Sequence, residues 1–186
     1  KALSKMKPIA AQVDDRVVPF LLPKPAKTIA SPLLRLESAS AGYEPGKPIL
    51  NNLSLRIDND DRIALLGQNG NGKSTFAKLI AGRLAPLSGK VYGAQKVEVG
   101  YFAQHQLDDL NPLSTPYDYM LKLMPDATEA QRRGKLGAFG FSFDKADTKC
   151  NVLSGGEKAR LLLALTAFHA PNLLILDEPT NHLDVD

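Results

Sequence analysis

The stretch Gly67–Ser74 constrains the fold of this chain more than any other. It reads Gly-Gln-Asn-Gly-Asn-Gly-Lys-Ser and fits the pattern G-x-x-x-x-G-K-[ST]. In such a loop, backbone N–H groups surround nucleotide phosphates, the lysine reaches the β- and γ-phosphates, and the last hydroxyl binds Mg²⁺. We expect a strand over Arg62–Leu66 before it and a helix over Thr75–Ala81 after it, whose dipole would point at the anion. A chance glycine-rich turn is the alternative, and these flanking patterns argue against it. The predicted nucleotide-binding residues are Gly67, Gln68, Asn69, Gly70, Asn71, Gly72, Lys73, Ser74 and Thr75.

The size and composition of the chain are those of an ordinary globular domain with an extension. Its 186 residues are 44% hydrophobic and 23% charged. The single cysteine, Cys150, excludes an internal disulfide and fits a reducing compartment. No apolar run approaches the length of about 20 residues that crosses a bilayer, and residues 1–8 lack the apolar segment of a signal peptide. We therefore expect a cytoplasmic protein.

The charge is distributed unevenly along the chain. Residues 1–35 carry a net charge of +5, whereas the remaining residues carry −2. A basic extension on a near-neutral domain fits either a polyanionic partner such as nucleic acid or a solvated linker, and charge alone favours the linker. Five prolines keep long regular structure out of residues 1–32, namely Pro8, Pro19, Pro23, Pro25 and Pro32. Compact structure is expected to begin at Leu33.

From there the chain has the order of an α/β nucleotide-binding domain with a helical insertion. Strands are expected over residues 33–37 and 53–57, separated by turn residues 42–48, and over residues 90–92 and 96–102. Helices are expected over residues 117–124, 128–136 and 156–168. The apolar run Leu173–Leu176 is typical of a buried parallel strand.

Two carboxylates, Asp177 and Glu178, follow this apolar run directly. Acidic side chains at the carboxyl end of a buried strand lie where α/β sheets bind their ligands. Asp177 is expected to hold Mg²⁺, directly or through water, and Glu178 to polarise an attacking water as a general base. A solvated turn is the ordinary alternative for an Asp-Glu pair, and the phosphate loop upstream makes it the weaker one.

A second anion site is predicted at the start of the long helix. Ser154 is a good N-cap, and Gly155 and Gly156 leave the helix N-terminus bare, with Glu157 next. The alternative is a capped loop with no ligand. One domain would then have two helix N-termini suited to phosphate. This fits a head-to-tail pair of such domains, in which the signature of each domain closes the nucleotide site of the other.

Taken together, these motifs resemble those of the ATP-binding cassette ATPases. The segments Leu153–Arg160 (Leu-Ser-Gly-Gly-Glu-Lys-Ala-Arg) and Asp177–Asp184 (Asp-Glu-Pro-Thr-Asn-His-Leu-Asp) resemble the ABC-F subfamily in particular. Members of that subfamily carry two cassettes on one chain and no membrane domain. The resemblance runs from about Leu33 to the last residue. It implies a P-loop NTPase fold of the α/β class, with an antiparallel β subdomain and a helical signature subdomain.

The resemblance also implies roles for further residues. Tyr43 matches the aromatic residue that stacks on adenine, and Gln104 matches the glutamine that contacts Mg²⁺ and the attacking water. Asp184 matches the residue that communicates across paired cassettes. The catalytic set is then Glu178, Gln104 and Lys73, and the Mg²⁺ set is Ser74, Gln104 and Asp177. Ser154, Gly155, Gly156 and Glu157 would act on the ATP of the partner cassette.

The family's switch histidine lies roughly thirty residues beyond this acidic strand end, and His182 does not match it. The chain therefore resembles the end of an interdomain linker, residues 1–32, followed by most of a second cassette, residues 33–186, cut at the loop that contains Asp184. We expect such a fragment to leave a strand edge and an apolar face uncovered.

The leading hypothesis is an ATP-binding and ATP-hydrolysing cassette of a cytoplasmic, ribosome-associated ABC-F protein. Its expected partners are the upstream cassette, the ribosome and tRNA, reached through the linker. An ATPase subunit of a transporter is one alternative, against which Asn181-His182 argues, since transporters commonly show Ser-Ala there. A nucleotide-binding module without turnover is another. The signature sequence argues against an unrelated P-loop kinase.

Overall fold

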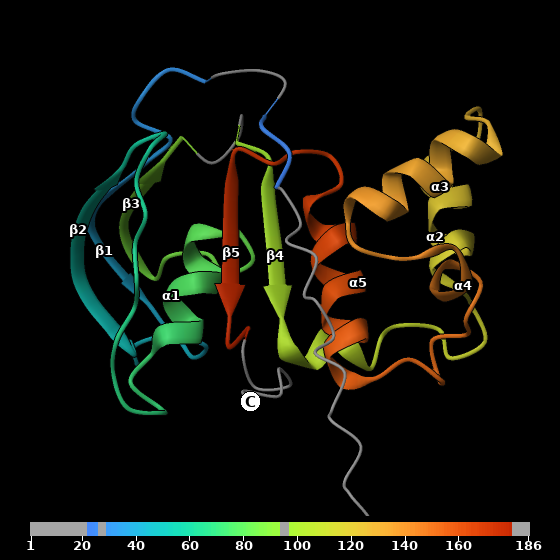
Figure 1. Cartoon of the computed structure of the whole chain (residues 1–186). Coiled ribbons are helices and arrows are strands. Elements are labelled where there is room, and N and C mark those ends of the chain that lie inside the picture. Colours follow the sequence, from blue (N-terminus) through green and yellow to red (C-terminus); the bar gives the residue numbers. More distant parts are fainter. Residues whose placement is uncertain (1–21, 26–28, 94–96, 180–186) are drawn as a thin grey trace, which may run out of the picture.

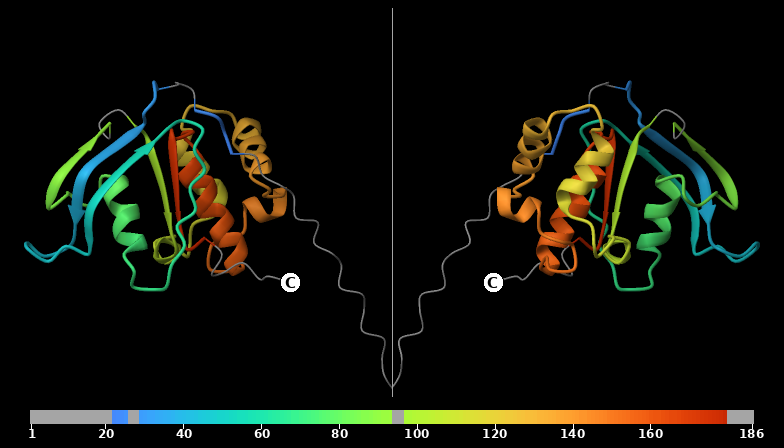
Figure 2. Two further views of the ribbon diagram at one scale, coloured as in Figure 1. Left: turned by 90° about the vertical axis from the view of Figure 1, so that its left-hand side faces the viewer. Right: turned by 90° about the vertical axis from the view of Figure 1, so that its right-hand side faces the viewer.

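The computed structural model describes residues 22–25, 29–93 and 97–179, except for the side chains of Gln104 and His105. Its elements form layers, and Figures 1 and 2 show these in the order antiparallel sheet, helix α1, parallel strand pair and helical region. In chain order they are β1 (Leu34–Ala41), β2 (Leu50–Ile57), α1 (Lys73–Ile80), β3 (Ser88–Tyr92), β4 (Val99–Ala103), η2 (Gln104–Leu107), α2 (Pro116–Leu123), α3 (Glu129–Ala138), α4 (Phe143–Ala146), α5 (Gly155–Ala167) and β5 (Leu173–Asp177).

The antiparallel sheet has the strand order β2-β1-β3. Side chains of β1 alternate between its two faces, so that Leu34 and Leu36 are fully buried while Arg35 is exposed. Arg35 lies opposite Arg56 on β2 and opposite Tyr92 on β3. The sheet therefore has an apolar inner face toward α1 and a charged outer face.

The parallel pair β4-β5 positions the carboxylate end of the candidate site. Its register runs from Val99 opposite Leu173 to Ala103 opposite Asp177. Both strands end at the same edge, so η2 begins beside Asp177. This arrangement confirms the prediction that Leu173–Leu176 is a parallel strand. It lies against α1 and the inner face of the antiparallel sheet in one apolar core.

A second apolar core lies among the helices. It joins Met120 of α2, Leu136 of α3, Ala146 of α4 and Leu161 of α5, all of which are almost completely buried. Thr115 and Thr128 cap α2 and α3 by accepting hydrogen bonds from the backbone three residues on. Helix α5 packs against β4 as well, so it connects the helical region to the parallel strands.

The strand expected over Arg62–Leu66 is absent from the described structure, so that prediction is wrong here. Residues 61–68 have no regular structure, and Figure 1 draws them as a plain coil leading into α1. Ile63 is half exposed and Leu66 is 93% exposed. A strand forms only where a neighbour completes its ladder of hydrogen bonds, and among the described residues β5 pairs with β4 alone.

Because residues 62–66 do not form a strand, β5 is less buried than expected. Of its four apolar residues only Ile175 is buried, and Leu176 is 45% exposed. The expectation of a fully buried strand is therefore wrong for this part of the structure. The short helix α4 was also not expected, since four residues are too few to show a hydrophobic period.

Candidate nucleotide-binding site

The loop Gly67–Ser74 leads directly into α1, as the sequence predicted. Gly72 is the residue before the helix and has a φ of 81°. Side chains rarely tolerate such a left-handed backbone, and a Cβ atom at Gly72 would come within 2.8 Å of Leu50 Cδ2. Glycine at this position therefore allows the loop to turn sharply against β2. The N–H groups of the first turn of α1 then face the loop without a side-chain cap.

Lys73 is bound to its own loop. Its Nζ atom donates hydrogen bonds to the carbonyl oxygens of Gly67, at 2.8 Å, and Gln68, at 2.9 Å. The ammonium group therefore lies within the turn that the phosphate pattern defines. A triphosphate would replace two neutral carbonyl acceptors with charged ones, which bind an ammonium more strongly.

Ser74 and Asp177 meet although they lie 103 residues apart in the sequence. The Ser74 hydroxyl donates to Asp177 Oδ1 at 3.2 Å. A hydroxyl and a carboxylate are both oxygen ligands, and Mg²⁺ is commonly held by one or two such groups together with substrate phosphates and water. The two residues therefore fit a magnesium ion, and their role as its ligands stays a prediction.

Tyr101, which the sequence did not single out, fixes the other oxygen of the same carboxylate. Its hydroxyl donates to Asp177 Oδ2 at 3.0 Å. Arg83 covers the tyrosine ring, with its guanidinium carbon 4.3 Å from the ring centroid. Burial and the hydrogen bond to Asp177 together raise the pKa of Tyr101 to about 12, so the phenol stays protonated and remains a donor.

Glu178 follows the end of β5 in an unusual backbone conformation. Its φ is 52°, a left-handed value that is uncommon for a residue other than glycine. The side chain is exposed, whereas Asp177 is half buried. The two adjacent carboxylates therefore lie in different environments, as a general base and a metal ligand would require.

Tyr43 lies beside α1, at the same site. Lys78 Nζ donates to the Tyr43 hydroxyl at 3.3 Å and lies 5.3 Å from the centroid of its ring. A hydrogen bond with Thr75 and the proximity of Lys78 lower the pKa of Tyr43. The ring is 56% exposed, so one side of it is open to a planar ligand.

The start of α5 has the capped geometry expected for the signature. Glu157 N–H donates to Ser154 Oγ at 3.2 Å, and Ser154 N–H donates to Glu157 Oε2 at 2.8 Å. Lys145 on α4 forms an ion pair with Glu157 at 2.7 Å. Partial burial opposes ionisation of Glu157, but its contacts with Lys145 and Ser154 outweigh that effect and lower its pKa. Figure 1 shows that α1 and α5 both begin at the lower edge of the molecule.

The sequence profile of the family described as "ABC transporter" matches residues 50–181, which include the loop, the start of α5 and the Asp-Glu pair. This chain belongs to that family of ATP-binding cassettes.

Curated relatives confirm the resemblance to ABC-F proteins. The cassette is 41% identical to "ABC transporter F family member 3" of Arabidopsis thaliana, over 100% of this chain and 26% of that protein. It is 49% identical to "Probable ATP-binding protein YheS" of Haemophilus influenzae, over 100% of this chain and 30% of that protein. It is 35% identical to "Protein GCN20" of Saccharomyces cerevisiae, over 99% of this chain and 24% of that protein. The chain thus spans about a quarter to a third of the length of these relatives.

Solved structures confirm the fold. The ATP-binding cassette MJ0796, in a dimeric post-hydrolysis state bound to ADP and Pi, matches with a TM-score of 0.67 at 25% identity over 82% of this chain and 76% of that one. A bacterial Atm1-family ABC exporter with ATP bound matches with a TM-score of 0.63 at 25% identity over 90% of this chain and 32% of that one. The fold is therefore the P-loop NTPase fold of a cassette.

Asp184, a predicted site residue, lies outside the described structure, as does His182. Gln104 is described only in its backbone, at the start of η2 beside the end of β5. In the described ranges, no helix is both long and apolar enough to span a bilayer.

Residues that the sequence reasoning missed all act through another residue. They are Tyr101, Lys78 and Lys145, which contact Asp177, Tyr43 and Glu157 respectively. Lys78 and Lys145 lie in no motif, and only the tertiary structure brings them to the site. Tyr101 lies on the strand that leads to Gln104 and could have been suspected from that position.

Proposed function

We propose that this chain is an ATP-hydrolysing cassette of an ABC-F protein that acts on the ribosome. The contact between Ser74 Oγ and Asp177 Oδ1, at 3.2 Å, carries the proposal for ATP. It brings the phosphate loop and the acidic strand end to one point, and Glu178 is adjacent. The membership of the chain in a cassette family and its ABC-F relatives support the same conclusion.

In this proposal the chain's own residues position the triphosphate. Lys73 moves from the carbonyls of its loop to the β- and γ-phosphates, and the N–H groups at the start of α1 face the phosphate oxygens. The ring of Tyr43, which lies beside α1, stacks on adenine. Mg²⁺, held by Ser74 and Asp177, would neutralise charge on the phosphate oxygens.

Glu178 then acts as the general base. Its carboxylate accepts a proton from a water molecule as that water attacks the γ-phosphorus. The bond between the γ-phosphorus and the β–γ bridging oxygen breaks, its electron pair stays on the bridging oxygen, and the products are ADP and inorganic phosphate. Gln104 is proposed to orient the same water.

The signature at the start of α5 serves the ATP of a partner cassette. Both α1 and α5 begin at one edge of the molecule, so a second cassette facing that edge would offer its α5 to the site at Lys73. Asp184 is proposed to contact that partner. The partner is the other cassette of the full-length protein.

The ribosomal role is supported by the sequence rather than by the described structure. The extended motif at Asp177–Asp184 resembles that of ABC-F proteins, and residues 1–35 carry a net charge of +5. RNA is a polyanion that such a charge can attract, although charge alone favours a solvated linker. We propose that residues 1–32 belong to a linker that approaches tRNA.

A glutamate-to-glutamine variant tests the whole proposal. In the full-length protein, Glu178→Gln removes the base but keeps the size of the side chain, so ATP should still bind while phosphate release falls by about 100-fold or more.

ATP-bound E178Q should sediment with ribosomes, and Lys73→Ala should not. Sedimentation with membrane vesicles instead would favour the transporter alternative. Absence of phosphate release from the unmodified protein would favour binding without turnover.

A further inference from the structure

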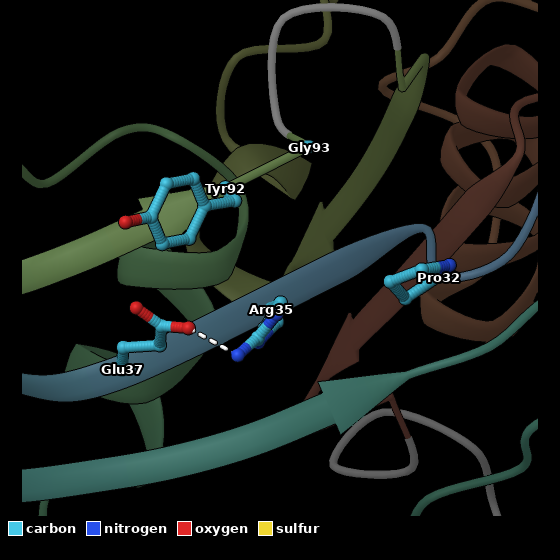
Figure 3. Close-up of a pocket in the computed structure, with 5 residues that line it drawn as sticks. All are labelled: Pro32, Arg35, Glu37, Tyr92 and Gly93. Carbon is cyan, nitrogen blue, oxygen red and sulfur yellow. Dashed lines mark ion pairs between the residues drawn. The ribbon is translucent and has the colours of Figure 1, made fainter.

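A cavity of about 440 Å³ lies on the outer face of the antiparallel sheet, away from the ATP site. It is lined by Pro32, Arg35, Glu37, Tyr92 and Gly93. Figure 3 shows the ring of Tyr92 on β3 beside the ion pair that Arg35 and Glu37 form on β1. The volume of the cavity lies within the range of about 300–1,000 Å³ that is common for small-molecule sites. None of these residues has a role in ATP binding as proposed above.

The cavity combines a flat apolar surface with one donor and one acceptor. Tyr92 is 44% exposed, although a large aromatic side chain is usually better covered. The side chains of Arg35 and Glu37 are 59% and 41% exposed, so each can make further hydrogen bonds beyond their own pair. A planar ring stacked on Tyr92 would have its edge next to both charged groups.

Guanine fits this combination best among the nucleobases. Its O6 accepts a hydrogen bond, which Arg35 can supply, and its adjacent N1–H and N2–H₂ groups are both donors, which suit the two oxygens of Glu37. Adenine, cytosine and uracil each lack this neighbouring pair of donors. A carboxylate beside a stacking ring therefore selects guanine by its Watson–Crick edge, which is free only in an unpaired nucleotide.

Further cations lie on the same face, where the phosphates of a strand would pass. Arg35 and Arg56 lie directly opposite each other on β1 and β2, and each is paired with a carboxylate, Arg35 with Glu37 and Arg56 with Asp58. The side chains of Arg35 and Arg56 nevertheless remain 59% and 60% exposed. On the other side, Lys90 lies opposite Glu37. These cations flank the cavity across three neighbouring strands, as phosphates before and after a bound base would require.

We propose that this face binds an unpaired guanine of a single RNA strand, with Tyr92 as the stacking surface and Arg35 and Glu37 as the groups that read the base. The proposal rests on the proposed ribosomal function and names one RNA contact within it. Arg56 and Lys90 contact the neighbouring phosphates.

Binding of short RNA tests this proposal without ribosomes or ATP. The probes are fluorescein-labelled heptamers of uridine with a central G, A or U, and the readout is fluorescence anisotropy with the full-length protein. We expect the G heptamer to bind about ten-fold more tightly than the others. Tyr92→Ala should weaken it about ten-fold, whereas Tyr92→Phe should bind within two-fold of the unmodified protein. Glu37→Gln should remove the preference for G.

Two controls keep the result specific. Phe143→Ala removes an aromatic side chain that is 67% exposed on the helical region, and it should bind like the unmodified protein. Phosphate release by Tyr92→Ala should be unchanged, so a failure of the ATPase proposal would be seen separately. Equal binding of all three heptamers, or equal binding by Y92A and F143A, would overturn the proposal. Full displacement of the G heptamer by an equal concentration of free GMP would also overturn it, because a free nucleotide would then be the ligand.

Discussion

The phenol of Tyr101 donates a hydrogen bond of 3.0 Å to Asp177 Oδ2, the carboxylate oxygen that Ser74 does not use. Asp177 is therefore held at both oxygens, once from the phosphate loop and once from the neighbouring strand β4. Arg83 lies over the same tyrosine ring and restricts its movement. Such a carboxylate has one orientation before any metal arrives, which lowers the cost of ordering the site.

Removing this phenol should loosen the carboxylate without emptying the site. For Tyr101→Phe we expect the free energy of unfolding to fall by about 1–2 kcal/mol in urea titrations, because a hydrogen bond to a charged group is lost. Turnover of ATP should fall several-fold while nucleotide affinity changes little. The matched control is Tyr119→Phe, which loses a hydrogen bond from Asn111 N–H in the helical region and should lower stability alone. Identical turnover in Y101F and Y119F would show that Tyr101 does not position Asp177.

Lys73 should account for most of the affinity of the site for nucleotide. Lys73→Ala removes the only side-chain cation of the loop, and two charge-assisted hydrogen bonds to phosphate are lost. We expect the dissociation constant for ATP, measured by calorimetry, to rise about 100-fold or more. Lys122→Ala, on the distant helix α2, should bind ATP normally. Full affinity in K73A would place the nucleotide elsewhere.

The ion pair between Glu157 and Lys145 should make the start of α5 sensitive to acid. The folded pKa of Glu157 is lowered, so its contribution to stability is complete above its ordinary value near 4.5 and is lost as the pH falls through the lowered folded value. Glu157→Gln keeps the cap and loses the pair, so its free energy of unfolding should be about 0.5 kcal/mol lower at pH 7. The difference between the two proteins should shrink as the pH falls below 4.5 and vanish once the pH is below the lowered folded pKa of Glu157.

A double-mutant cycle provides the control for this pair. Lys145→Met should cost a similar amount, and the combined variant should cost no more than either single change, because both remove the same interaction. Urea titrations at pH 7 and at two acidic values would measure all four proteins. The assignment would be contradicted if the losses in free energy of unfolding were additive in the combined variant. It would also be contradicted if the difference in free energy of unfolding between E157Q and the unmodified protein grew on acidification.

Exposed apolar side chains around the ATP site should cause the isolated chain to self-associate. Leu66 is 93% exposed, and Ile63, Leu65 and Leu176 are 43–50% exposed. Sedimentation velocity at rising concentration should show oligomers, and Leu66→Gln should reduce them. Val152→Gln, which changes a residue that is 70% exposed in the helical region, should have little effect. A monomer at all concentrations would count against this expectation.

The sequence was sufficient for those parts of the site that local chemistry determines. The loop at Gly67–Ser74 and the cap at Ser154 depend on glycine conformation and on hydrogen bonds within three or four residues, and both were predicted with nearly correct bounds. The parallel strand Leu173–Asp177 followed from its apolar run. These features need little information from distant residues.

Features that depend on distant neighbours were not predictable in the same way. Residues 62–66 have the composition of a strand, but a strand needs a partner, and periodicity alone cannot supply one. The contact between Tyr101 and Asp177 spans 76 residues and depends on the parallel register of β4 and β5. The pairing of Arg35 with Arg56 likewise depends on how β1 and β2 align. Only the folded chain shows these relationships.

Because α1 and α5 both begin at one edge of the molecule, the pairing of two cassettes has an electrostatic consequence. A helix N-terminus carries a partial positive charge, so this edge presents two such ends, one on each side of the strand pair β4-β5. Two cassettes that approach each other with these edges would repel until something negative fills the gap. The triphosphate would then be both the substrate and the counter-ion that permits contact between the two cassettes. Its cleavage would restore the repulsion between their helix N-termini.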